Sequence, residues 1–356
     1  VLRTLLETID AESSETSNPI DKEQLFNAMN QTIGFFGINK IIFELIRDWI
    51  LENFRQEYER RKSFLGLNDT ETLAAANTLA NIYDDQGKFE EAEPLYVLCL
   101  GVLKENFGLD NPFTLTMMNN LASLYDSQGK SEEAKALYTE CLEKQLEVLG
   151  LENADTLRTM SNLGLLYFTL EEYDKAEPLL SQCLAKRRET LGPEHVLTLR
   201  LITKLALLYD YMGRVEESET LYKESLSIQK ELLGEDHLDT LETMSFLGLL
   251  YLSQGRCEEA EPILIECLEK RKDLLGWDSP TTLSSMQSLA VAYRDQGKFD
   301  DAKVLFLECI DRRKAVLGED HPQTIMSITA LNRMYEQLSL PEPPSEKTTP
   351  LNQTTV

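Results

Sequence analysis

The sequence predicts an all-α protein that forms an α-solenoid, a stack of antiparallel helix pairs. The deciding observation is a repeat of 42 residues, which three columns of residues share without a gap. The glycine column is Gly66, Gly108, Gly150, Gly192, Gly234, Gly276 and Gly318. The tyrosine column is Tyr83, Tyr125, Tyr167, Tyr209, Tyr251, Tyr293 and Tyr335. A threonine before leucine or isoleucine stands at Thr72, Thr114, Thr156, Thr198, Thr240, Thr282 and Thr324. Periods of roughly 20–50 residues are typical of stacked supersecondary units.

Each repeat reads as two helices. In the repeat that follows Gly108, the apolar residues Leu115, Met118 and Tyr125 recur at helical spacing. Gly129 then ends the first helix, and the amphipathic run 131–149 predicts a second one. Prolines fit the first turn of three first helices, because the missing N–H has no intrahelical partner there. These prolines are Pro112, Pro280 and Pro322.

Large and small residues alternate in the predicted helices. In the first helix, leucine precedes alanine or glycine at positions 79, 121, 163, 205, 247 and 289. In the second helix, a small residue recurs at Ala92, Ala134, Ala176, Ser218, Ala260 and Ala302. One helix pair cannot bury its apolar face alone, so the pairs must stack. Glu171 replaces the glycine between two helices, where a left-handed non-glycine residue costs roughly 1 kcal/mol.

Four segments are predicted along the chain. Residues 1–20 are acidic and contain Ser and Thr, which predicts a disordered N-terminal segment. Residues 21–65 predict a helical N-terminal cap or a divergent repeat. Residues 66–338 hold six 42-residue repeats and a terminal capping helix. Residues 339–356 are rich in Pro, Ser and Thr, which predicts a disordered tail.

The charge excludes some classes of partner. The formal net charge is −26, from 35 basic and 61 acidic residues. Nucleic acids and anionic membrane surfaces are therefore not expected partners, because their phosphates would be repelled. No apolar run reaches the roughly 18 residues that span a bilayer, and no signal peptide is recognised at the start. Residue 1 is Val1 and not Met, so the chain can be part of a longer protein.

The cysteines are predicted to be packing residues. Five of the six share one column of the second helices: Cys99, Cys141, Cys183, Cys267 and Cys309. Residues on successive stacked repeats lie beyond the roughly 7 Å that a disulfide spans, so free thiols and a reducing, cytoplasmic location are expected. Ser225 fills the remaining place in the column, and Cys257 lies off it at a position expected to be half-buried.

No catalytic or metal site is predicted. His195, His237 and His321 occupy one loop position in different repeats and cannot converge on one metal. Acidic pairs such as Glu90 and Glu91 recur at helix starts, where carboxylates are favourable. There is no phosphate-binding glycine loop, nucleophile elbow or metal-ligand spacing. The sequence therefore predicts a protein that is not an enzyme and has no cofactor.

These columns resemble the tetratricopeptide repeat. The usual period of that repeat is about 34 residues; the 42-residue form, the loop "LGEDHP" at 317–322 and the runs "GKFEEAE" and "AEPLY" near residue 90 resemble the kinesin light chain type. The similarity covers about residues 66–338. It implies a right-handed superhelix that binds other proteins, with kinesin heavy chain as one expected partner. Similar arrays form the sensor arms of some signalling ATPases, so the alternative is such a C-terminal arm with its ATPase domain upstream.

The resemblance also implies a binding groove lined by the first helices. Two columns face it: Thr78, Asn120, Asn162, Lys204, Phe246, Ser288, and Ala74, Thr116, Arg158, Arg200, Glu242, Ser284. In peptide-binding members of the family, asparagines and basic residues at these positions hold a peptide backbone and a carboxylate. The candidate site is therefore Asn120, Arg158, Asn162, Arg200, Lys204 and Phe246. Thr116 departs from the pattern, since the family's carboxylate clamp has a further lysine there. The other interpretation is that these are ordinary solvated residues.

The favoured function is a scaffold that binds an extended, acidic peptide in this groove, like the cargo domain of a kinesin light chain. The C-terminal residues "TTV" add a separate hypothesis. Thr354 and the terminal Val356 match the motif that PDZ domains bind as an added strand.

Overall fold

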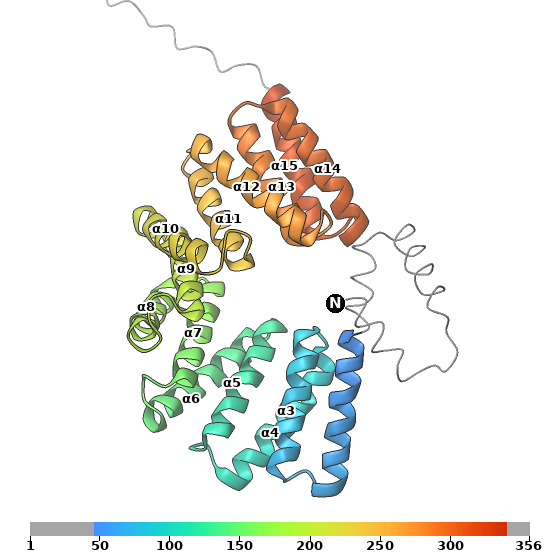
Figure 1. Cartoon of the computed structure of the whole chain (residues 1–356), viewed down its shortest axis with the longest axis vertical. Helices are drawn as coiled ribbons and strands as arrows, with labels where there is room; N and C mark the ends of the chain where they lie inside the picture. Colours follow the sequence, from blue (N-terminus) through green and yellow to red (C-terminus); the bar gives the residue numbers. More distant parts are fainter. Residues whose placement is uncertain (1–45, 340–356) are drawn as a thin grey trace, which may run out of the picture. The chain divides into compact units, whose positions relative to one another are not determined.

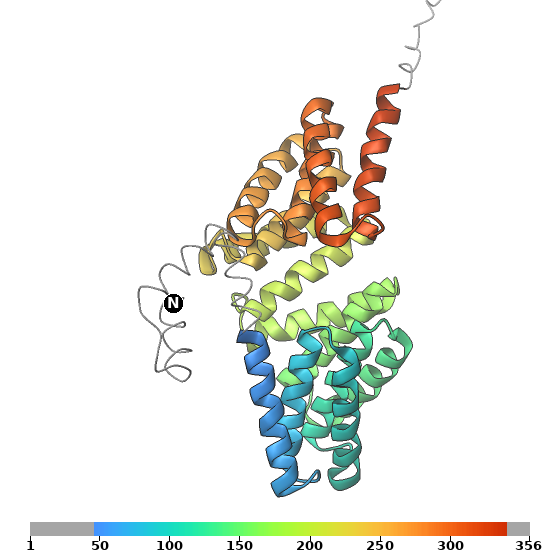
Figure 2. The ribbon, with the colours of Figure 1, turned by 90° about the vertical axis from the view of Figure 1, so that its right-hand side faces the viewer.

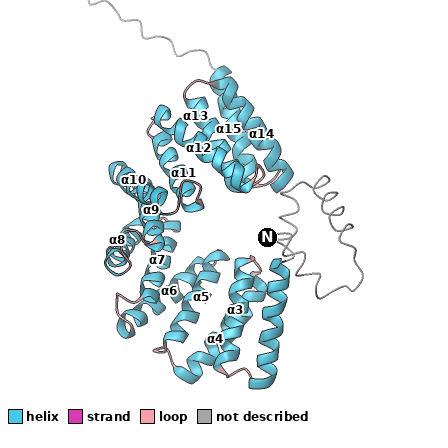
Figure 3. Cartoon of the chain, in the orientation of Figure 1, coloured by secondary structure: helices cyan, strands magenta, loops and turns pink. Residues whose placement is uncertain are grey.

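The structure, a computed structural model, describes residues 46–339, and every regular element in that range is a helix (Figures 1 and 3). It divides into two compact units at the boundary between Val148 and Leu149. Three predictions fall wholly or mostly outside the described residues: the N-terminal segment 1–20, the cap over 21–65 as far as residue 45, and the C-terminal tail from residue 340 on with its PDZ-type motif.

The first unit contains a helix over 46–65 and two helix pairs. The pairs are α3 (Thr70–Asp85) with α4 (Phe89–Phe107), and α5 (Pro112–Ser127) with α6 (Ser131–Val148). The helix over 46–65 runs beside the first pair in both Figures 1 and 2. It is tied to that pair by Arg61, whose Nη1 donates to the Glu71 carbonyl at 3.3 Å.

The second unit contains four helix pairs and a last single helix. They are α7 (Ala154–Thr169) and α8 (Tyr173–Thr190), α9 (Val196–Tyr211) and α10 (Val215–Leu232), α11 (Leu238–Ser253) and α12 (Cys257–Leu275), α13 (Pro280–Asp295) and α14 (Phe299–Leu317), then α15 (Pro322–Ser339). The all-α solenoid prediction is confirmed.

Helix order creates two different faces in the second unit. Each helix packs on the next one in the chain, and the first helices of successive pairs also touch directly, α7 with α9, α9 with α11, α11 with α13 and α13 with α15. The described second helices α8, α10, α12 and α14 make no such contacts with one another. We call the surface of α7, α9, α11, α13 and α15 the first-helix face, and that of α8, α10, α12 and α14 the second-helix face.

The loop histidines cap helices. The Nδ1 atom of His195 accepts a hydrogen bond from the backbone N–H of Leu197 at 3.2 Å. His237 accepts from Asp239 in the same way at 3.1 Å. An N-cap acceptor satisfies one of the backbone donors that a helix start leaves free. The predicted structural role of these histidines in the loop is therefore confirmed.

The turn between the two helices of a pair needs a left-handed residue. Glycines with positive φ occupy this turn in five of the six pairs. The remaining pair has Glu171 with φ 61°, the one described non-glycine residue with positive φ. The predicted strained turn is therefore present at α7–α8.

A recurring hydrogen bond accounts for the cysteine column. Each of the five thiols in the column donates to the carbonyl of the leucine that follows the column threonine, as Cys183 does to Leu157 at 3.2 Å. Ser225 makes the same bond to Leu199 at 3.2 Å, so serine replaces cysteine there without loss of the donor. All six cysteines are free and buried. Cys257 is only 8% exposed, so the expectation that it is half-buried was wrong.

Candidate functional site

Five of the six predicted site residues lie in the second unit. Arg158 and Asn162 are on α7, Arg200 and Lys204 on α9, and Phe246 on α11. On each of α7 and α9 the two residues are four positions apart, which places them one turn apart on the same side of the helix. Asn120 lies on α5 in the first unit.

The two cations of α9 are already paired with carboxylates of α11. Arg200 Nε donates to Asp239 Oδ2 at 2.8 Å, and Lys204 Nζ donates to Glu242 Oε1 at 2.8 Å. The Asp239 side chain is only 14% exposed, whereas that of Arg200 is 54% exposed. The hydrogen bond from Arg200 to Asp239 raises the pKa of the Arg200 guanidinium above its ordinary value.

Arg158 also has an acidic neighbour, since its Nη2 lies 3.2 Å from Asp155 Oδ1 one turn earlier on α7. Each of the three predicted cations therefore has a carboxylate beside it, and the expected basic strip is close to neutral. Sequence reasoning missed these partners. The signal was present in one case, because Glu242 follows Arg200 by one 42-residue repeat and so belongs to the same column.

The apolar part of the site is partly covered. Phe246 is half-buried and stacks on Tyr222, with ring centroids 6.1 Å apart. The Lys204 ammonium lies 5.4 Å from the centroid of the Phe246 ring, within the range of a cation–π contact. Leu249, one turn along on α11, is 42% exposed and offers the more open apolar surface.

The asparagines lie at similar positions on their own helices. Asn120 is half-buried and its Nδ2 donates to Oδ1 of Asn77 on α3 at 3.0 Å. Asn162 is half-buried on α7. An asparagine amide both donates and accepts, which matches the groups of a peptide backbone.

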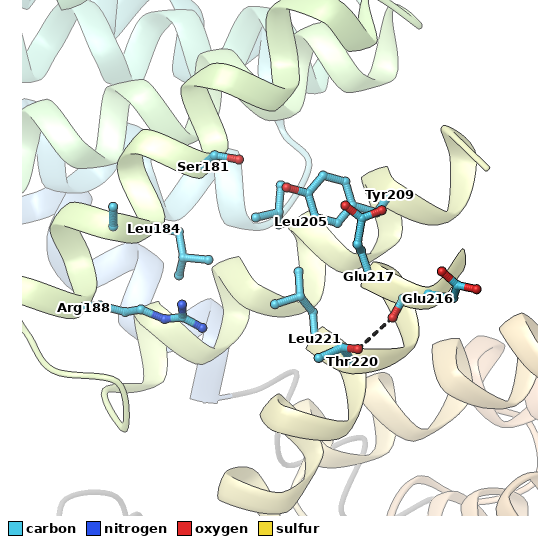
Figure 4. A pocket seen from close by; sticks show the side chains of 10 residues that line it. Ser181, Leu184, Arg188, Leu205, Tyr209, Glu216, Glu217, Thr220 and Leu221 are labelled. Carbon is cyan, nitrogen blue, oxygen red and sulfur yellow. Dashed lines mark hydrogen bonds between the residues drawn. The ribbon is translucent and has the colours of Figure 1, made fainter. Parts of the chain in front are cut away.

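A surface cavity is lined by residues of α8, α9 and α10, none of which is a predicted site residue. Figure 4 shows Leu184 and Arg188 of α8 facing Leu221 of α10, with Leu205 and Tyr209 of α9 above Leu221 in this view. Its volume is about 510 Å³. The Arg188 guanidinium at its edge is paired with Glu224, at 2.6 Å from Nη2 to Oε1.

The described residues hold no group of three or more His, Cys, Asp and Glu side chains placed to bind a metal ion. None of the described helices combines the length and the apolar character that a membrane span requires.

The 42-residue spacing and the packing of the helix pairs are shared with a known family. A tetratricopeptide repeat profile matches residues 71–147, 155–231 and 201–273, which is more than half of the chain, and a second such profile matches residues 282–323. The chain belongs to the tetratricopeptide repeat family. Among curated proteins, none matches it.

Solved structures of kinesin light chain-like repeats are similar to these tetratricopeptide repeats. The nearly identical TPR-like repeats of a Podosopora anserina protein described as a kinesin light chain are 26% identical, with a TM-score of 0.51 over 58% of this chain and 98% of that one. BtubC (BKLC) from P. vanneervenii is 20% identical, with a TM-score of 0.53 over 65% of this chain and 91% of that one. At that identity BtubC shows the fold alone. The repeats and their kinesin light chain-like relatives support a protein-interaction scaffold with a protein as its partner.

Proposed function

We propose that the chain binds an extended segment of a partner protein on the first-helix face of the second unit, and that this segment carries carboxylates. The observation that carries the proposal is the pair Arg200 and Lys204, one turn apart on α9 and held in place by neighbours on α11. The asparagine of α7 offers hydrogen bonds to a peptide backbone, and the exposed Leu249 offers an apolar contact.

The existing ion pairs are compatible with such a ligand. The Arg200 side chain is 54% exposed and that of Glu242 is 40% exposed. Ion pairs open to solvent contribute only about 0–1 kcal/mol each, so a peptide carboxylate can compete with the internal ones. Arginine then offers the incoming carboxylate two parallel N–H donors, a geometry that strengthens the contact.

The similarity to kinesin light chain repeats favours a cargo-adaptor role, with the motor's heavy chain as a further partner.

Asn120 is proposed to make an equivalent backbone contact on the first unit. The helix over 46–65 is proposed as the N-terminal cap of the array, since its Tyr58 is buried. The sensor arm of a signalling ATPase stays as the alternative prediction.

The test is a binding titration on the chain with peptides selected from an acidic peptide library. Arg200→Glu should weaken binding by about five- to tenfold, which corresponds to roughly 1–1.4 kcal/mol for one charge-assisted contact. Arg188→Glu is the matched control, because it makes the same charge change at a paired arginine on the second-helix face. Equal binding by parent and Arg200→Glu, or equal losses in both variants, would contradict the proposed surface.

A further inference from the structure

Three aromatic side chains meet at the turn between α7 and α8 and the end of α9. The ring centroids of Phe168 and Tyr211 are 5.2 Å apart, with the planes at 82°. Tyr173 lies 6.0 Å from Phe168 and 6.5 Å from Tyr211. We call these three residues the turn patch. Tyr211 is 62% exposed, so the patch presents an aromatic ring to solvent.

The repeat columns show that the solenoid does not need these rings. The residues equivalent to Phe168 are Asp84, Asp126, Asp210, Leu252 and Arg294. Those equivalent to Tyr211 are Asp85, Ser127, Thr169, Ser253 and Asp295. Every other repeat packs without an aromatic side chain at either position. Phe168 and Tyr211, on neighbouring repeats, therefore differ from the residues at equivalent positions. The stacking of the repeats does not explain why both are aromatic.

The turn patch borders a surface hollow of about 350 Å³ that residues 171–175 line. Glu171 and Asp174 are exposed there, on either side of the half-buried Tyr173. Lys175 forms an ion pair with Glu172, and its Nζ lies 5.3 Å from the centroid of the Tyr167 ring. The hollow therefore combines Tyr173, one ring of the turn patch, with exposed carboxylates and a lysine that is already paired.

This combination selects one chemistry of ligand. An arginine guanidinium stacks on the face of a tyrosine ring and is stabilised by carboxylates near the ring. The net charge of −26 would also attract a basic segment over long range. An acidic segment would be repelled by Glu171 and Asp174 at this place. The patch thus differs in ligand chemistry from the first-helix face.

We propose that the turn patch is a docking surface for a basic segment of a partner protein, with an arginine side chain stacked on Tyr211 and its charge facing Glu171 and Asp174. Phe168 and Tyr211 stand at the C-terminal ends of α7 and α9, about two helical turns beyond Asn162 and Lys204 of the proposed peptide site. One partner with an acidic and a basic segment, or two different partners, would satisfy both surfaces.

The test uses two fluorescein-labelled decapeptides of alternating glycine and basic residues, one with arginine and one with lysine, in anisotropy titrations. The parent chain should bind the arginine peptide more tightly, because the two peptides have equal charge and only arginine stacks well. Tyr211→Ser and Phe168→Ser should each weaken the arginine peptide by about two- to fivefold, the size of one exposed cation–π contact. Neither change alters the protein's charge, so a loss cannot come from long-range attraction.

Three controls separate the patch from general effects. Leu252→Ser removes an apolar side chain at the position equivalent to Phe168 and should leave binding unchanged. Tyr211→Phe keeps the ring and should bind like the parent. Arg200→Glu on the first-helix face should not weaken the arginine peptide. Equal binding of both peptides by the parent, or an unchanged arginine-peptide affinity in Tyr211→Ser and Phe168→Ser, overturns the proposal. An equal loss in Leu252→Ser overturns it as well.

Discussion

A Cβ atom on Gly164 would lie 2.6 Å from Cδ2 and 2.8 Å from Cγ of Leu180. The same relationship recurs two repeats later, where a Cβ on Gly248 would lie 2.7 Å from Cδ2 of Leu264. In the other four repeats alanine takes the first position and an aromatic residue the second, namely Ala80 with Tyr96, Ala122 with Tyr138, Ala206 with Tyr222 and Ala290 with Phe306. Glycine thus accompanies the leucine that branches at Cγ, and alanine accompanies a flat ring.

Gly164→Ala is therefore expected to destabilise the chain. Overpacking a close-packed helix contact costs about 1–3 kcal/mol, which exceeds the gain of about 1 kcal/mol from replacing glycine inside a helix. The net effect should be about 1 kcal/mol, measured by urea unfolding. Adding Leu180→Tyr should recover most of the loss, because it recreates the alanine–aromatic pair.

Gly101→Ala is the matched control for that experiment. Gly101 lies inside α4, and outside its own helix backbone and chain neighbours no atom lies within 4 Å of the place that an added Cβ would take, so the same substitution should stabilise the chain slightly. If Gly164→Ala proves as stable as the parent, or Leu180→Tyr brings no recovery, size matching does not explain the column.

Glu219 connects two successive repeats through a shared carboxylate. It accepts hydrogen bonds from Arg256 Nη1 at 2.7 Å, Lys223 Nζ at 2.6 Å and the Tyr251 hydroxyl at 3.2 Å. The hydrogen bonds from Arg256 and then Lys223 hold the pKa of Glu219 at about 2, below its ordinary 4.5. A carboxylate with a lowered pKa stabilises the fold above its unfolded pKa, and this contribution is lost as pH falls toward the folded value.

Glu219→Gln should therefore lower the free energy of unfolding at pH 7 by about 1 kcal/mol, the usual size for a charge-assisted contact that is partly exposed. The difference from the parent should shrink below about pH 4.5 and vanish near pH 2, where the parent carboxyl is also protonated. Urea unfolding at several pH values measures it. Glu258→Gln, at an exposed position on α12, makes the same charge change and should leave the free energy of unfolding at pH 7 close to that of the parent.

The buried cysteines should be chemically inert in the folded chain. Burial raises the pKa of the Cys99 thiol to about 12 and that of Cys183 to about 11. Because the thiolate is the reactive form, a thiol reagent at pH 8 should modify these residues only after unfolding. Six thiols should then react in denaturant, as counted by mass spectrometry. Rapid native labelling of Cys99 or Cys183 would show that the column is open to solvent.

Removing the internal competitor of Arg200 should strengthen acidic-peptide binding. Asp239→Asn leaves the guanidinium without its carboxylate at 2.8 Å, so a ligand carboxylate no longer has to displace one. The expected gain is about two- to fivefold, given that such pairs contribute about 0–1 kcal/mol. Asp278→Asn is the control, because it breaks an arginine pair of similar length, 3.0 Å to Arg312, outside the first-helix face. A gain of the same size in both variants would attribute the effect to net charge alone.

The sequence by itself determined the architecture of this protein. The 42-residue period shows that one helix-pair unit recurs along the chain. The glycines at the turns and the prolines at first-helix starts are local signals, and each acts through the backbone of the residue that carries it. For the same reason the sequence was sufficient to predict the left-handed turn at Glu171, which is observed with φ 61°. It was also sufficient for the column of buried thiols, since equivalent positions in a regular repeat have equivalent burial.

Only the tertiary structure decided the character of the candidate site. The sequence placed Arg200 and Lys204 in one strip, but whether that strip is basic depends on side chains 38 and 39 residues away that reach across from α11. The turn patch likewise requires Phe168 and Tyr211 from neighbouring repeats to meet within 5.2 Å. Repeat columns give the position of each residue along its own helix. The distance between side chains on different helices follows from packing and rotamers, which no column records.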